Sequence, residues 1–216
     1  LRLEQSLEEY VKASMLIDLL RADARLGLGD GPRPIFDMSV GYDLKGLRSA
    51  PVDAFVRGMK DASAVVERLR GELSREAHRK ARFETALSDT LTLSTFHGCP
   101  PDEIEAMASH VMTEWGLHCT VKLNPTLLGY DEVHRLLHGA LGYEGVRCPR
   151  EAFDKDATWE QVLGFTRRLA AKAKGLSRGF GAKFTNTLVV ENPGDFLPAA
   201  EKLQYLSGAP LHVLAM

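Results

Sequence analysis

The sequence predicts an α/β fold, and within that class a (β/α) barrel of the TIM type. Along the 216 residues, short apolar runs alternate with segments in which apolar residues recur at helical spacing. This alternation is typical of βαβ units, which build a parallel sheet. Polar, reactive residues directly follow the apolar runs, as they do at a barrel mouth, where the carboxyl ends of the strands meet.

Five apolar runs bounded by turn-forming residues are expected to be strands, at residues 35–40, 91–95, 119–123, 145–148 and 181–185. A closed barrel needs eight strands, and this chain opens on a helix. We therefore expect residues 1–216 to be a single domain, an incomplete barrel from a longer protein. The last stretch, 211–216, fits either a strand or the start of a helix.

Helices are expected in the gaps, at residues 6–26, 52–73, 101–112, 131–138 and 159–174. The third of these has a clear start signal: Pro101 suits the first helical position, and Asp102 and Glu103 follow in the first turn, where the helix dipole favours anions. The charged segment 74–80 is expected to be a solvated helix end.

Composition excludes several classes. The 27 basic and 29 acidic side chains leave a net charge of −2, so no basic field recruits nucleic acid. No apolar run approaches the roughly 18 residues of a membrane span. Three cysteines without Cys-x-x-Cys spacing favour a reducing, cytoplasmic compartment and are too few for a four-cysteine iron–sulfur site in this chain. No glycine-rich dinucleotide or Walker loop follows a strand.

Lys122 is the first candidate site residue, because it ends a predicted strand just before Asn124-Pro125. A cation at a barrel mouth stabilises negative charge on a bound group, since the low dielectric strengthens the interaction. Lysines on barrel strands also form Schiff bases with carbonyl substrates, and Lys183 fits that role equally well. The alternative is a surface lysine at a strand end.

Cys99 and His97 are the second candidate, in the turn before the helix at Pro101. Amides at a helix start lower the pKa of a cysteine and favour the thiolate, and His97 is close enough in sequence to share a proton. The alternative is a small buried thiol. Two further metal ligands are not evident beside this pair, so no metal site is expected.

Two polar residues at other strand ends complete the candidate set. The Asn186 amide, within Thr185-Asn186-Thr187, can hydrogen-bond the edge of a heterocycle or merely cap a turn. Asp43 either binds a ligand or starts a turn.

Four strings resemble a known family: Asp37–Leu44, Ser94–Pro101, Val121–Tyr130 and Lys183–Thr187. They are similar to the amino-terminal barrel of the selenate reductase family, long iron–sulfur flavoproteins whose barrel is similar to dihydroorotate and dihydropyrimidine dehydrogenases. The resemblance runs along nearly the whole chain.

The resemblance to the pyrimidine dehydrogenases implies roles for individual residues. Cys99-Pro100 matches the catalytic Cys-Pro of that family, and Lys122-Leu-Asn124-Pro125 matches the Lys-Leu-Thr-Pro strand that holds the flavin, with Lys183 as the competing lysine. Thr185-Asn186-Thr187 matches a substrate-binding Thr-Asn-Thr.

The chain also departs from the dehydrogenase pattern. His97-Gly98 replaces the residue before the catalytic cysteine, Ser94 or Thr95 stands where the family has Asn, and Asp43 stands where a substrate-binding Ser-Tyr-Asn has its amide. These departures put pyrimidine recognition in doubt.

The resemblance implies a segment of a flavin-dependent, iron–sulfur-linked oxidoreductase that binds FMN and a small-molecule substrate. Iron–sulfur clusters and NAD(P) or FAD would belong to other redox domains of the same polypeptide. Two alternatives remain open: a flavin-free barrel that serves as a scaffold for redox modules, and a Schiff-base lyase. Open sheet edges also favour a homo-oligomer.

Overall fold

The computed structural model of the chain describes residues 2–29, 31–32, 34–74, 81–194 and 197–216. These residues divide into two compact units. Unit 1 comprises Leu1–Met38 and Lys45–Thr90, and unit 2 comprises Ser39–Leu44 and Leu91–Met216. Every candidate site residue lies in unit 2, so unit 1 is described briefly.

Unit 1 is helical. Its elements are α1 (Leu3–Ala22), the 3-10 turn η1 (Ala24–Leu26), α3 (Ala50–Lys60) and α4 (Ser63–Arg70), and the short α2 (Leu44–Leu47) starts at the unit boundary. Helix α1 packs against both α3 and α4. Val11 and Met15 of α1 and Val56 and Met59 of α3 are buried, and their removal from water stabilises the unit.

The helix expected at 52–73 is wrong as a single element, because the chain breaks at Asp61–Ala62 into α3 and α4. The Asp61 carboxylate accepts hydrogen bonds from the Ser63 backbone N (3.0 Å) and Oγ (2.5 Å). The Ala62 N–H donates to the Thr85 carbonyl (2.8 Å) instead of a helical partner. Of the expected helix end at 74–80, residues 75–80 lie outside the described part of the chain.

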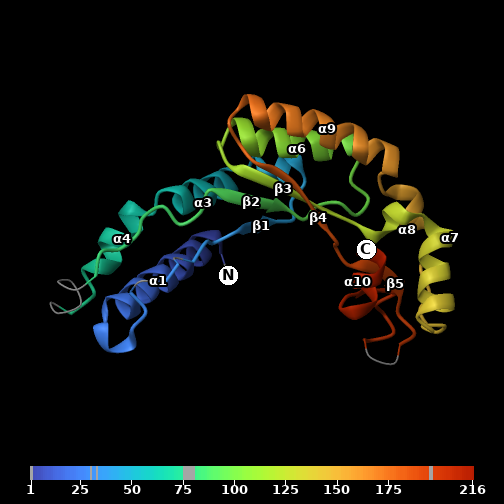
Figure 1. The fold of residues 1–216 in the computed structure, drawn as a ribbon, viewed down its shortest axis with the longest axis horizontal. Coiled ribbons are helices and arrows are strands. Elements are labelled where there is room, and N and C mark those ends of the chain that lie inside the picture. The colour runs from blue at the N-terminus through green and yellow to red at the C-terminus, as the bar shows by residue number, and fades with distance from the viewer. Residues whose placement is uncertain (1, 30, 33, 75–80, 195–196) are drawn as a thin grey trace. The chain divides into compact units, whose positions relative to one another are not determined.

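Unit 2 is built on a four-stranded sheet in the order β1-β2-β3-β4. The strands are β1 (Met38–Val40), β2 (Thr90–Leu93), β3 (His118–Leu123) and β4 (Phe180–Phe184). The first residues of β1 and β2, Met38 and Thr90, are counted in unit 1. Strands β3 and β4 pair in parallel, with Lys122 opposite Lys183. Helices α6 (Pro101–Thr113) and α9 (Trp159–Gly175) lie side by side over one face of the sheet (Figure 1).

The contact between these helices and the sheet follows from sequence periodicity. Alternate β3 residues Cys119, Val121 and Leu123 are buried, as are the apolar residues of α6 at helical spacing. The polar alternates of β3, Thr120 and Lys122, are only half-buried.

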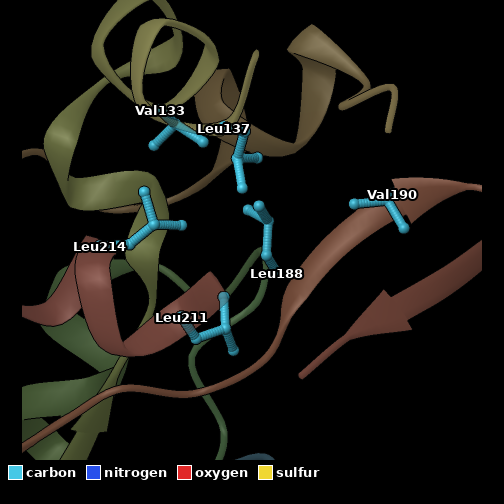
Figure 2. Close-up of a cluster of buried hydrophobic side chains, with 6 residues drawn as sticks. All are labelled: Val133, Leu137, Leu188, Val190, Leu211 and Leu214. Atoms are coloured by element: carbon cyan, nitrogen blue, oxygen red, sulfur yellow. The ribbon is translucent and has the colours of Figure 1, made fainter. Parts of the chain in front are cut away.

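The rest of unit 2 forms a second apolar cluster. Its elements are η2 (Pro125–Leu128), α7 (Tyr130–His134), the π-helix η3 (Arg135–Ala140), α8 (Arg150–Lys155), the antiparallel hairpin of β5 (Leu188–Glu191) and β6 (Leu203–Leu206), and α10 (Ala209–Ala215). Figure 2 shows how α7, η3, β5 and α10 direct buried side chains at one another: Val133, Leu137, Leu188, Val190, Leu211 and Leu214.

The α/β class and the helices between the strands are confirmed, but some boundaries are not. The strand expected at 145–148 is wrong: the backbone there is irregular, and the carbonyl of Val146 lies 2.6 Å from His138 Nε2. The helix at 131–138 continues as the π-helix η3, and the ambiguous stretch 211–216 belongs to helix α10. Within the described ranges, no helix has the length and apolar character needed to cross a membrane.

Candidate functional site

The ends of the four sheet strands are tied together by hydrogen bonds. The Ser94 N–H, just after β2, donates to the Val40 carbonyl of β1 (2.7 Å). The Asn186 N–H, just after β4, donates to the Leu123 carbonyl of β3 (2.7 Å), and its side-chain Nδ2 lies 3.5 Å from the Ser94 carbonyl. The loops that leave these strands therefore share one edge of the sheet, as expected for a barrel mouth.

Lys122 lines a pocket of about 280 Å³ at this edge. The other polar lining residues are Thr185, Asn186, Thr187, Ser207 and His212. The pocket lining contains no carboxylate, and no acidic residue in the described part of the chain forms an ion pair with Lys122. The pocket thus presents a cation, hydroxyl groups and an amide, which suit an anionic or acceptor-rich ligand.

Lys183 occupies a different environment, although it is the cross-strand neighbour of Lys122. Its side chain is exposed and is not among the residues that line the pocket. Like charges directly opposite in a sheet repel one another, so an anion near the pair is favoured. Of the two lysines that the sequence left in competition, Lys122 is the one that reaches the pocket.

Asp156 organises the loop that carries His97. Its side chain is only 2% exposed, and its carboxylate accepts hydrogen bonds from the Gly98 N–H (2.7 Å), Asn124 Nδ2 (2.7 Å) and Thr126 Oγ1 (2.6 Å). The same Asn124 Nδ2 lies 2.8 Å from His97 Nδ1. Gly98 adopts a φ of 65°, in the left-handed region that glycine favours, and this conformation accompanies the N–H contact with the carboxylate.

Two atoms of this group are buried without a hydrogen-bond partner among the described residues, His97 Nε2 and Asn124 Oδ1. Burial lowers the pKa of His97 below 6.5. Asp156 opposes this shift, and the positive charge of Lys122 adds to it. His97 is therefore biased towards the neutral imidazole at physiological pH.

The protonation state of Cys99 differs from the one expected of a cysteine at a helix start. It is 6% exposed, and burial raises its pKa to about 11, with further increases from Glu103, Asp102 and Asp43. The expected thiolate is wrong, because desolvation and nearby carboxylates outweigh the helix-start amides. At neutral pH, Cys99 keeps its proton.

The remaining predicted residues differ in how far their polar atoms are engaged. Asn186 is buried, and its Oδ1 accepts from the Thr187 N–H (3.0 Å), while Thr185 Oγ1 donates to the Leu123 carbonyl (3.0 Å). These contacts resemble the turn-capping alternative for Asn186. Asp43 is exposed, in the loop after β1, where Thr95 Oγ1 donates to the neighbouring Tyr42 carbonyl (2.6 Å).

Sequence reasoning missed Asp156 and Thr126. Asp156 follows the short helix α8, and Thr126 lies in η2, so neither stands at the end of a predicted strand. The one available signal was the position of Asn124, whose buried amide after a strand requires partners from elsewhere in the chain.

Comparison with known proteins supports the barrel fold expected from the sequence. The whole chain, residues 1–216, matches the family described as "Oxidoreductase YgfK, N-terminal TIM-barrel domain". Two curated proteins named "Putative oxidoreductase YgfK", from Escherichia coli strain K12 and from Escherichia coli O157:H7, are each 39% identical over 231 residues. The match covers 97% of this chain and 22% of each relative, so the chain spans less than a quarter of their length. No solved structure matches the chain.

Proposed function

This chain belongs to the family of N-terminal TIM-barrel domains of the oxidoreductase YgfK, and from that membership we propose that it is the FMN-binding barrel of a flavin-dependent, iron–sulfur-linked oxidoreductase. The resemblance to selenate reductases and to dihydroorotate and dihydropyrimidine dehydrogenases supports the flavin. The family name supports only the broader class, an oxidoreductase.

The observation that carries the proposal is Lys122 in its carboxylate-free pocket. A reduced flavin carries negative charge at the pyrimidine-like edge of its ring, and a fixed cation there stabilises it. The pocket volume of about 280 Å³ lies just below the range of whole-ligand pockets, about 300–1,000 Å³. It suits one edge of a ring system and leaves the rest of the cofactor to other residues.

The chain's own residues have separable tasks in this proposal. A bound flavin supplies hydride transfer to or from a small-molecule substrate. Lys122 holds the cofactor side of the site, and Asp43 with Thr185–Thr187 orients the substrate. Asn124 is fully buried outside the pocket lining and contributes through its hydrogen bonds to Asp156 and His97. Cys99, with its pKa raised to about 11, suits a proton donor and not a base. Neutral His97 lies beside it in sequence and supplies a second proton-bearing group.

Other redox centres are assigned to other domains. The chain spans 22% of its curated relatives, and we propose that iron–sulfur clusters and the NAD(P) or FAD site lie in the remaining length. Electrons would then reach the barrel from those domains. In this proposal the partners of the barrel are its substrate and the other domains of the same polypeptide.

The flavin content of the full-length protein tests the proposal. FMN and FAD are released by denaturation, separated by chromatography and counted per polypeptide, because FAD from another domain would otherwise mask the result. We expect FMN in the wild type and a loss of roughly tenfold or more in Lys122→Gln, since a charged hydrogen-bonding partner is removed.

The control is Lys174→Gln, which removes an exposed lysine from the surface of α9. It should leave FMN and FAD unchanged. A folded full-length wild type without FMN would overturn the proposal and favour the flavin-free scaffold. Unchanged FMN in Lys122→Gln would overturn the role of Lys122.

A further inference from the structure

We infer that Asp156 is a positioning residue that acts through Asn124 to hold the single proton of neutral His97 on Nε2. The consequence for catalysis rests on the proposed function, but the tautomer does not. The inference is carried by hydrogen bonds among buried groups of unit 2.

The first step is the orientation of the Asn124 amide. Asn124 is fully buried, and one end of its amide lies 2.7 Å from Asp156 Oδ2. The nitrogen must occupy that end, because the amide oxygen would otherwise face a carboxylate oxygen at hydrogen-bond distance, acceptor against acceptor. The Gly98 N–H and the Thr126 hydroxyl donate to the same carboxylate and keep it in place.

The second step is the tautomer of His97. An amide nitrogen has two protons, and Asn124 Nδ2 directs one at Asp156 and the other at His97 Nδ1, 2.8 Å away. His97 Nδ1 must then accept, so in the neutral ring the proton is on Nε2. Asp156 thus controls His97 without contacting it directly, since its nearest carboxylate oxygen is 4.0 Å from Nδ1.

The third step concerns the hydrogen-bonding atoms that this arrangement leaves without a partner. His97 Nε2 is a donor and Asn124 Oδ1 an acceptor, and both are buried without a partner in the described ranges. An unsatisfied buried group raises the free energy of the fold, and a ligand that supplies the missing partner offsets the cost. In the neutral ring, His97 is therefore a proton donor through Nε2, with Nδ1 committed to Asn124.

The test is the protonation pattern of His97 in the full-length protein labelled with ¹⁵N-histidine. Solid-state ¹⁵N NMR separates protonated from unprotonated ring nitrogens, and the His97→Gln spectrum identifies the signals of His97. At pH 8 we expect the Nε2–H form in roughly tenfold excess or more, as one buried hydrogen bond dictates.

The Asp156→Asn variant has a specific expected signature. The Gly98 N–H needs an acceptor at the Oδ1 position, so the new amide nitrogen takes the place of Oδ2. There it would face Asn124 Nδ2, donor against donor. The Asn124 amide therefore turns over and presents its oxygen to His97. His97 Nδ1 must then donate, and the tautomer changes to Nδ1–H. A purely structural role of Asp156 would not reverse the tautomer. Asp154→Asn, which removes an exposed carboxylate two residues away, should keep the wild-type pattern.

A second variant tests the same inference if the first does not fold. If Asp156→Asn does not fold, Asp156→Ser removes the carboxylate and should give a mixture of tautomers. An Nδ1–H form in the wild type, or an unchanged Nε2–H form in the folded Asp156 variants, would overturn the inference. Absence of FMN together with the Nε2–H form would overturn only the proposed function.

Discussion

At the scale of single residues, the protonation state of Cys99 depends strongly on its surroundings. Its pKa of about 11 compares with a reference of 9.0. At pH 8 the raised pKa lowers the fraction of thiolate about a hundredfold. A thiolate of higher pKa is also more nucleophilic, which offsets about tenfold of the resulting loss in reaction rate. Because burial also limits access of the reagent, we expect iodoacetamide to alkylate Cys99 at least roughly tenfold more slowly than a free cysteine peptide, as followed by mass spectrometry.

Two variants on helix α6 sharpen this prediction. Glu103→Gln should accelerate alkylation, because Glu103 raises the Cys99 pKa by its charge and by a hydrogen bond. Glu105→Gln, which removes the partner of Arg168 on the same helix, should change nothing. Alkylation of wild-type Cys99 as fast as the free peptide would contradict the protonated thiol.

His97 should make stability depend on pH. Because burial lowers its pKa in the folded state below 6.5, the unfolded chain binds the proton first as the pH falls. The free energy of unfolding should therefore decrease as the pH falls through about 6.5 and level off below the folded pKa. Urea midpoints from pulse proteolysis at pH 7.5 and 5.5 should differ less in His97→Gln than in the wild type, and an equal difference in both would contradict the shift.

The residue types at the site could be predicted from the sequence, but their protonation states and hydrogen-bond partners could not. Lys122 and Cys99 stand out because they follow predicted strands. The protonated thiol of Cys99 depends on its burial and then on nearby carboxylates such as Glu103. The partner of Asn124 is Asp156, which lies 32 residues away. No local pattern reports a contact over such a separation.

At the scale of elements, the cluster shown in Figure 2 holds β5 and α10 beside the pocket. Leu188→Ala removes a fully buried side chain from its centre and should lower the free energy of unfolding by about 2–5 kcal/mol. Hydrogen exchange of β5 and α10 peptides in the full-length protein should accelerate. Leu203→Ala, at a side chain 49% exposed in β6, is the control and should shift stability by less than about 0.5 kcal/mol. Equal effects would contradict the cluster's role.

Elements with strong periodicity could be predicted, and those set by distant partners could not. Helix α9 begins at the Thr158 cap and runs close to its expected length. The break between α3 and α4 depends on the Thr85 carbonyl, and the hairpin of β5 and β6 depends on pairing across a loop. In both cases tertiary contacts outweigh local preference.

At the scale of the whole molecule, the family match spans both compact units. We propose that they act as one domain. The described sheet has β1 and β4 at its edges, and unpaired strand edges invite another strand. The 216-residue chain made alone should therefore self-associate with rising concentration in light scattering, and a monodisperse monomer at every concentration would contradict this.

The central claim is that this barrel binds FMN beside Lys122. A cryo-EM map of the full-length protein with FMN bound tests it most directly, because the map would show where the flavin lies. The account predicts the ring at the carboxyl ends of β3 and β4, with one edge within hydrogen-bond reach of Lys122 Nζ. A ring bound elsewhere, with the Lys122 pocket filled by protein side chains, would contradict it.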